Sequence, residues 1–343
     1  MYTGIETFHL VYISLHFKMD KTLKISLNKS IEERPSDTLN IQMNLDDTHF
    51  AVGCSDGMVR IYALSSCHLI RTLNCRMTTL TPAVTSIRWR PSKSSTQNIL
   101  FATTGDGFIS HWHATSGKLL DKFQLTDIQV LCSDITTSGL KFALGCHDNT
   151  VKVFDENSRS HLFTCDPGRG NRLGHSNRIF AVKWLDENLL VSGGWDNNVI
   201  LWDVRAGRSV GGVFGPLIAG ESIDFCEDLL YTGSYDFKNQ VQVWDIRNFS
   251  LVNEVNLPQS ERQAKVYSLQ FVKNIGKEYF VAGCTGDQQI IGFNRRSMSA
   301  FDSVGGDAAV YCLDFCQGKE KFVSVNTEHL IAVYDLVENN DIN

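Results

Sequence analysis

The feature that most limits how this chain can fold is a repeated pair of residues, an acidic residue followed six positions later by an aromatic one. Six copies are Asp56/Tyr62, Asp106/Trp112, Asp148/Phe154, Asp196/Trp202, Asp287/Phe293 and Glu328/Tyr334. A seventh pair, Asp236 and Trp244, carries two extra residues in its turn. Successive aromatic residues lie 41 to 50 positions apart. A period of this size, with several short strands per unit, is typical of propeller blades.

The local pattern within one unit predicts strands rather than helices. In Leu189–Arg205, two short apolar runs flank a polar turn at 194–198. Each run is too short for a helix and is bounded by Gly or Asn, so the segment predicts an antiparallel strand pair. The acidic residue falls in the turn, where a carboxylate accepts hydrogen bonds from nearby backbone amides.

These motifs resemble the WD-repeat β-propeller family over about residues 21–343, with Trp202-Asp203 and Trp244-Asp245 as the dipeptide of that family. In the family, a buried His, Ser, Asp and Trp are linked by hydrogen bonds within a blade. The resemblance implies that only the fourth unit keeps this structural polar set, at His175, Ser192, Asp196 and Trp202. In the other units we expect the set to be incomplete, with Tyr or Phe replacing Trp.

The two ends of the repeat region are expected to meet. The seventh unit supplies three strands and then a polar tail, so it lacks a fourth. Thr22–Leu27 alternates apolar and polar residues and is predicted to be that missing outer strand. Closing the ring in this way removes exposed sheet edges. The predicted fold is all-β, a seven-bladed β-propeller over 21–343, in which the first strand of each unit lines the channel.

Residues 1–20 do not match the repeat and are predicted to be an N-terminal extension. His9–Phe17 is apolar but spans only nine residues, too few to cross a bilayer. It lacks a basic lead-in and a small-residue cleavage site, so a secretory signal is not expected. We expect an extra strand or a flexible arm, and Met19 is an alternative start.

Composition and charge argue against several classes of partner. The hydrophobic content of 43% suits a large buried core, and the net charge of −6 does not favour nucleic acid or an acidic membrane.

Cys54, Cys146 and Cys284 occupy the same slot in three units, so ring geometry keeps them from sharing one metal. We therefore expect buried thiols, no cofactor and no metal. The expected location is the cytoplasm, with the nucleus or a ciliary or cytoskeletal structure as alternatives.

No motif for catalysis is present. The chain has no glycine-rich phosphate-binding loop ending in Gly-Lys, no His-Glu-x-x-His and no paired Cys-x-x-Cys. His147-Asp148 could suggest acid–base chemistry, but Asp148 is one of the repeated turn residues. The sequence therefore predicts a non-catalytic scaffold or adaptor that binds other proteins or peptides on the faces of the ring.

A glycine-rich basic loop is one candidate binding site. It contains Arg169 and Arg172, and Arg178 follows closely. Guanidinium groups and free backbone amides could hold a phosphate or an acidic peptide. The alternative is an ordinary surface loop. Gly215–Gly220 is a second candidate, as a peptide-contacting rim on the same face, or else a close connection between blades.

Trp202–Arg205 and Trp244–Arg247 resemble the WDxR box of substrate receptors for cullin-based ubiquitin ligases. The resemblance implies that Arg205 and Arg247 would contact the propeller-rich adaptor of the ligase, on the face opposite the basic loop. Alternatively, each arginine pairs with a neighbouring carboxylate. A third prediction is a structural role in a ciliary or cytoskeletal assembly.

Overall fold

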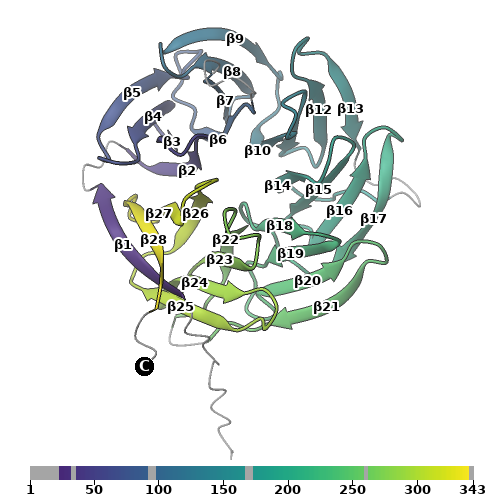
Figure 1. Cartoon of the computed structure of the whole chain (residues 1–343). Coiled ribbons are helices and arrows are strands. Elements are labelled where there is room, and N and C mark those ends of the chain that lie inside the picture. Colours follow the sequence, from purple (N-terminus) through teal and green to yellow (C-terminus); the bar gives the residue numbers. More distant parts are fainter. Residues whose placement is uncertain (1–22, 32–35, 92–97, 167–172, 259–261, 340–343) are drawn as a thin grey trace, which may run out of the picture.

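The structure, a computed structural model, describes residues 23–31, 36–91, 98–166, 173–258 and 262–339. Within these ranges the chain forms 28 strands and no helix. The strands make seven four-stranded antiparallel sheets, arranged as blades around a common axis (Figure 1). The predicted all-β, seven-bladed β-propeller is therefore confirmed. The described residues contain no helix long and apolar enough to span a membrane.

Each blade runs outward from an inner strand. Blade one contains β2 (Thr38–Met43), β3 (His49–Cys54), β4 (Met58–Ala63) and β5 (Leu69–Asn74). Blade two contains β6 (Val84–Trp89), β7 (Ile99–Thr104), β8 (Phe108–His113) and β9 (Lys118–Gln124). Blade three contains β10 (Val130–Ile135), β11 (Lys141–Cys146), β12 (Val151–Asp155) and β13 (His161–Cys165). Blade four contains β14 (Ile179–Trp184), β15 (Leu189–Gly194), β16 (Asn198–Asp203) and β17 (Arg208–Phe214); blade five, β18 (Ile223–Cys226), β19 (Leu229–Gly233), β20 (Val241–Asp245) and β21 (Ser250–Val255). Blade six contains β22 (Val266–Phe271), β23 (Tyr279–Cys284), β24 (Gln288–Asn294) and β25 (Ala300–Gly305); blade seven, β26 (Val310–Phe315), β27 (Lys321–Asn326), β28 (Ile331–Glu338) and β1 (Leu23–Ile31).

The N-terminal strand closes the ring, as predicted. β1 pairs antiparallel with β28, with Ile25 opposite Leu336 and Leu27 opposite Tyr334. Figure 1 shows the purple β1 lying outside the yellow β28. The strand is longer than predicted, because it continues past a bulge after Leu27 to Ile31. Residues 1–20 and Thr22 lie outside the described residues, so the division into an extension and a propeller stays a prediction.

The repeated aromatic residue is buried on the third strand of each blade, and its partner on the second strand depends on its size. Where it is Tyr or Phe, a phenylalanine lies opposite and stacks on it; the pairs are Phe50/Tyr62, Phe142/Phe154, Phe280/Phe293 and Phe322/Tyr334. Where it is Trp, a leucine lies opposite; these pairs are Leu100/Trp112, Leu190/Trp202 and Leu230/Trp244. Aromatic stacking thus fills the blades that lack an indole.

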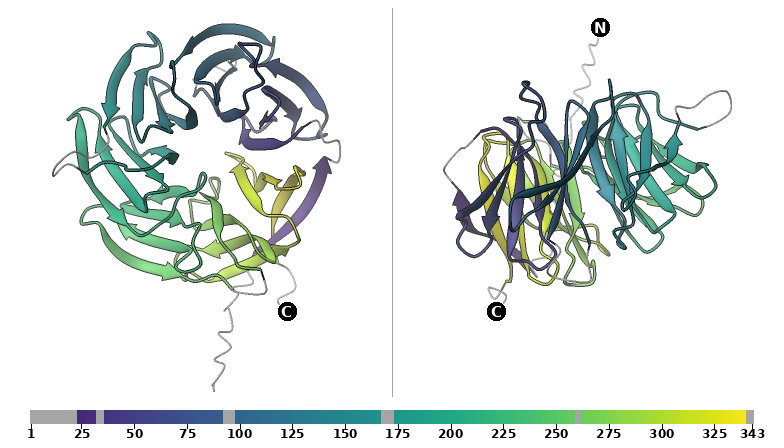
Figure 2. Two further views of the ribbon diagram at one scale, coloured as in Figure 1. Left: turned by 180° about the vertical axis from the view of Figure 1, so that it is seen from behind. Right: turned by 90° about the horizontal axis from the view of Figure 1, so that it is seen from above.

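Neighbouring blades contact one another through their inner strands all around the ring. Figure 2 shows the ring from behind and from above, with the blades side by side and their connections on two opposite faces. The turns between second and third strands lie on one face together with the connections between blades. We call this face the channel-mouth face. The connections from first to second and from third to fourth strands lie on the opposite face.

Candidate interaction site at the mouth of the channel

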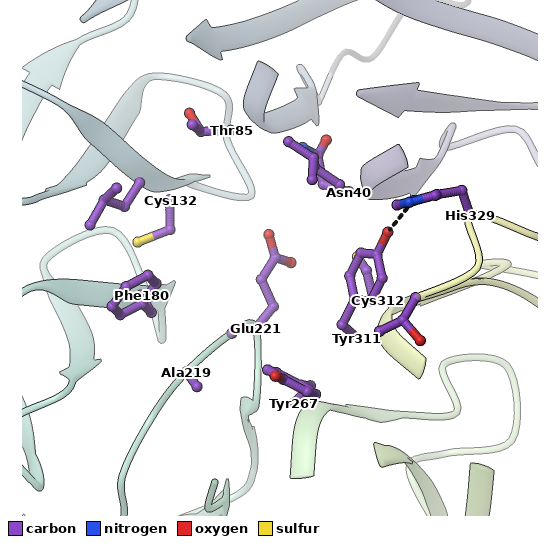
Figure 3. Close-up of a pocket in the computed structure, with 14 residues that line it drawn as sticks. Asn40, Thr85, Cys132, Phe180, Ala219, Glu221, Tyr267, Tyr311, Cys312 and His329 are labelled. Atoms are coloured by element: carbon purple, nitrogen blue, oxygen red, sulfur yellow. Dashed lines mark hydrogen bonds between the residues drawn. The ribbon is translucent and has the colours of Figure 1, made fainter. Parts of the chain in front are cut away.

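Six of the seven inner strands carry a β-bulge at the same place, one residue after the strand begins. The bulged residues are Leu39, Thr85, Leu131, Phe180, Tyr267 and Tyr311. A bulge takes a residue out of the hydrogen-bonded ladder and re-aims its side chain. All six side chains line one cavity of about 380 Å³ at the channel-mouth face (Figure 3).

The seventh position is filled by a connector rather than by a bulge. β18 of blade five begins late, and the chain before it runs along the cavity, where Ala219, Gly220 and Glu221 form part of the wall. A Cβ on Gly220 would lie 2.5 Å from the carbonyl oxygen of Tyr267, so glycine is required there. The predicted rim Gly215–Gly220 thus contributes two residues to the cavity, while its Ile218 is fully buried between blades.

Glu221 supplies the charge of this cavity. Figure 3 shows its carboxylate pointing into the space between Cys132, Asn40 and Tyr311. The described lining holds no other carboxylate and no lysine or arginine. Glu221 Oε1 lies 2.8 Å from Arg88 Nη2, deeper along the axis. The cavity therefore presents an anionic group among aromatic rings and hydroxyl groups.

A second ring of side chains lies below the first, one from the matching position of each inner strand. Its members are Gln42, Arg88, Asp134, Lys183, Asp224, Gln270 and Asp314, and all of them line a second cavity of about 410 Å³ toward the opposite face. Glu221 lines both cavities, so its contact with Arg88 lies between them.

The aspartates of this second ring lie on blades three, five and seven, and each joins its blade to the next one. Each accepts a hydrogen bond from a backbone amide of the next blade: Trp184 to Asp134 at 2.8 Å, Phe271 to Asp224 at 2.9 Å and Met43 to Asp314 at 2.7 Å. Burial opposes ionisation of Asp314, yet Lys273, Gln42 and the Met43 amide together lower its pKa. Burial also disfavours the charge of Arg88, but Glu221 and Asp134 raise its pKa. The ring is thus a set of paired charges.

The structure brings the four residues of the polar set together in blade four. His175 Nδ1 lies 2.9 Å from Asp196 Oδ2, and His175 Nε2 lies 2.7 Å from Ser192 Oγ. The indole nitrogen of Trp202 donates to the same Ser192 Oγ at 2.8 Å. Burial opposes the charge of Asp196, but the hydrogen bond and charge of His175 lower its pKa. These contacts tie the channel-mouth turn to the centre of the blade.

The expectation that Tyr or Phe replaces Trp in all other units is wrong for two blades. In blade two the indole of Trp112 donates to Ser110 Oγ at 2.9 Å. In blade five the indole of Trp244 donates to Thr232 Oγ1 at 3.1 Å. Thr232 occupies the position that Ser192 has in blade four, so blade five keeps half of the set. A hydroxyl on the second strand, or on the third strand as in blade two, is enough to satisfy a buried indole N–H.

The two WDxR arginines lie on the face opposite the channel mouth. Arg205 Nη2 is 3.7 Å from Asp203 Oδ2, and Arg247 Nη2 is 2.6 Å from Asp245 Oδ2. Hydrogen bonds from Arg247 lower the pKa of Asp245 to about 2. Both guanidinium groups are mostly exposed. They pair with the aspartate of their own dipeptide and still face solvent.

Arg178 is exposed on the channel-mouth face, where its carbonyl accepts a hydrogen bond from the amide of Trp195. Trp195 is half exposed and lies against Phe180 of the cavity wall, with ring centroids 5.0 Å apart. Phe214 and Phe237 are also exposed on this face of blades four and five. Arg169 and Arg172 lie outside the described residues. This aromatic rim was not predicted from the sequence.

All ten cysteines are free thiols, and nine of them are buried. Burial raises the pKa of Cys146 to about 12, which keeps its thiol protonated. In the part of the chain that the structure describes, no group of three or more His, Cys, Asp or Glu side chains could hold a metal ion.

Seven four-stranded blades, acidic residues in the turns between second and third strands, and a buried indole bonded to a hydroxyl define a seven-bladed β-propeller. The chain belongs to the WD-repeat family of these propellers. A family model described as the beta propeller of DDB1- and CUL4-associated factor 12 matches residues 145–213.

Three relatives illustrate the similarity. The spindle assembly checkpoint protein bub3 of Schizosaccharomyces pombe is 31% identical over 172 residues, covering 49% of this chain and 48% of that protein. A guanine nucleotide-binding protein subunit beta of Zea mays is 24% identical over 174 residues, covering 48% and 44%. F-box/WD repeat-containing protein 9 of Bos taurus is 25% identical over 217 residues, covering 60% and 44%. The chain spans less than half the length of each of these relatives.

Proposed function

We propose that this protein is a scaffold that binds a partner protein at the channel-mouth face, and that the partner presents a lysine or arginine side chain to Glu221. The observation that carries this proposal is the Glu221 carboxylate in a cavity walled by Phe180, Tyr267 and Tyr311. A cation is attracted both to a carboxylate and to the faces of aromatic rings. The relatives support a role in protein assemblies, since one is a checkpoint protein and another is a G-protein subunit.

The surroundings of the cavity favour a protein over a small molecule. The half-exposed Trp195 and the exposed Phe214 and Phe237 extend the aromatic surface beyond the cavity across blades four and five. Large aromatic side chains are enriched where proteins bind one another. A partner that covers this rim would exclude water from the cavity and strengthen the contact to Glu221.

Affinity purification of the full chain with mass spectrometry tests this proposal. We expect Glu221→Gln to lose the main partner, and Leu131→Lys to lose it as well, because a lysine in the wall repels a cationic side chain. Glu254→Gln on the exposed outer strand β21 is the matched control and should retain the partner. Melting curves exclude variants that unfold. Recovery of the same partner with both channel variants contradicts the proposal.

A second candidate is a substrate receptor of a cullin-based ubiquitin ligase. The match to the DDB1- and CUL4-associated factor propeller supports it, because residues 145–213 include the first WDxR motif and Arg205. Asp203 and Asp245 would hold the two arginines in position for an adaptor on the opposite face. Co-purification of a propeller-rich adaptor, lost in Arg205→Ala with Arg247→Ala, would support this function. Cytoskeletal proteins in the same purification would instead favour a structural assembly.

We propose the cytoplasm as the location, because ten free cysteines suit a reducing compartment. Fluorescence microscopy of the tagged full chain tests this, and a nuclear or ciliary signal would contradict it.

A further inference from the structure

In blades one to six, the turn between the third and fourth strands carries a residue with left-handed backbone. These residues are Cys67, Gly117, Arg159, Gly207, Phe249 and Met298, with φ between 53° and 73°. Gly117, Arg159, Gly207 and Phe249 each lie against the outer strand of the preceding blade. Each therefore sits at the opening of the groove between two blades.

Each of these turn residues faces one residue on the outer strand of the preceding blade, which we call the groove residue. At successive blades the two residues are matched in size or charge. Gly207 lies beneath Phe163, and the ring of Phe249 lies over Gly211, where a Cβ would be 2.1 Å away. In another groove Arg159 Nε lies 3.0 Å from Asp121 Oδ2. Each of these three grooves is thus closed by a large residue facing a glycine, or by an ion pair. Between blades four and five, with Phe249 in place, the remaining cavity is only about 10 Å³.

The groove between blades five and six departs from this rule. The matching positions hold Asn253 and Met298, neither of which is a large ring facing a glycine. A cavity of about 360 Å³ remains there. Its wall contains the aliphatic side chains of Leu229, Val243 and Val252. The space that Phe249 fills in the groove between blades four and five is therefore open between blades five and six.

Two arginines border this cavity. Arg295 is mostly buried, its Nη1 lies 3.2 Å from Cys226 Sγ, and its buried Nε has no hydrogen-bond partner among the described residues. Arg296 is 78% exposed. The carboxylates nearest to them, Glu227 at 3.7 Å and Glu278 at 3.5 Å, are more than half exposed and beyond direct hydrogen-bond distance. A closer carboxylate could therefore displace them.

We propose that this groove binds a short acidic segment of a partner protein, with a bulky apolar side chain in the cavity and a neighbouring carboxylate on Arg295 and Arg296. The aliphatic wall gains from burying an apolar side chain, and guanidinium groups bind carboxylates through paired hydrogen bonds. The groove opens beside the exposed outer strand β21, where an extended segment can approach. This site is separate from the channel mouth.

The test uses the full chain with ¹³C-methyl methionine, and follows the Met298 resonance by NMR. The probe is the peptide acetyl-Ser-Leu-Glu-Ser-amide, and its neutral form carries glutamine in place of glutamate. We expect saturable shifts with a dissociation constant on the order of millimolar for the acidic peptide, as for other small ligands. The neutral peptide should bind roughly tenfold more weakly, because it loses a charge-assisted hydrogen bond.

Variants of the groove complete the test. Arg296→Gln should remove the preference for the acidic peptide, and Asn253→Phe should abolish binding of both peptides by filling the cavity as Phe163 does. Arg205→Gln is the matched control, because Arg205 occupies the same turn position in blade four and is similarly exposed. Melting curves verify that each variant folds. Absence of shifts in the wild type, equal affinity for both peptides, or binding retained in Asn253→Phe would overturn the proposal.

Discussion

Arg88 of blade two and Glu221 of the connector to blade five form an ion pair across the channel, with Nη2 and Oε1 2.8 Å apart. The two residues come from blades that are not neighbours, so this contact links parts of the ring that share no sheet. Arg88 also lies 3.3 Å from Asp134. The pair separates the two channel cavities, so the same contact supports the fold and places the carboxylate at the mouth.

Loss of the Arg88 guanidinium should destabilise the ring strongly. Arg88→Met leaves Glu221 and Asp134 without their cation in a mostly buried site, which costs about 3–5 kcal/mol of unfolding free energy. Chemical denaturation followed by fluorescence measures the change. Arg205→Met, at an exposed surface site, should stay within about 0.5 kcal/mol. If the two variants were equally stable, the cross-channel pair would have no structural role.

Asp314 should make stability depend on acid pH. The pKa of its carboxyl is lower in the folded chain than in the unfolded chain, where it is about 3.9. The stabilisation is therefore complete above the unfolded pKa and is lost as the pH falls through the lower, folded pKa. Asp314→Asn should lose about 1–3 kcal/mol at pH 7, with a difference from wild type that shrinks below about pH 4. A difference that is constant from pH 7 to pH 3 would contradict this assignment.

The sequence was sufficient for the fold because the aromatic residue of each repeated pair is buried. Asp196 accepts a hydrogen bond in the turn, and Trp202 fills the core of the blade. The spacing between them follows from the length of the strand that carries Trp202. Ile25 could be assigned to the last blade because the seventh unit lacked a strand. Substitution of Trp by Tyr or Phe did not obscure the period, since a stacked phenylalanine fills the space instead.

The channel site was harder to predict because it depends on the register of the inner strands. Phe180 faces the cavity only because a bulge interrupts the pairing of β14 with β15. A recurring Val-x-Ser or Val-x-Cys at the start of inner strands, as in Val84–Ser86 and Val310–Cys312, is the signal that an alignment of the repeats could have used. Glu221 keeps the spacing of that pattern, since Ser222 follows it and Asp224 lies three residues on, but Gly220 replaces the valine and hides the match.

Ser192 should contribute more to stability than its counterpart in blade five. Ser192→Ala leaves both the indole N–H of Trp202 and Nε2 of His175 without their buried partner, at about 1–3 kcal/mol for each group. Thr232→Val keeps the shape of the side chain and removes only the bond to Trp244. Thermal melts of the two variants compare the effects. Equal losses of melting temperature would mean that His175 adds no stability to the polar set.

Closure of the ring by β1 should be measurable at a single side chain. Ile25 is 6% exposed and packs among blade-seven residues, and its amide donates to Asp302 of blade six at 2.6 Å. Ile25→Ala should cost about 2–5 kcal/mol, because it leaves a cavity between the blades. Leu27→Ala in the same strand is the control, since Leu27 is 58% exposed and should tolerate truncation. Deletion of residues 21–30 should lower the melting temperature further, because it frees the edge of β28 from Ala332 to Glu338. An unchanged melting temperature after that deletion would mean that the ring stays closed without its N-terminal strand.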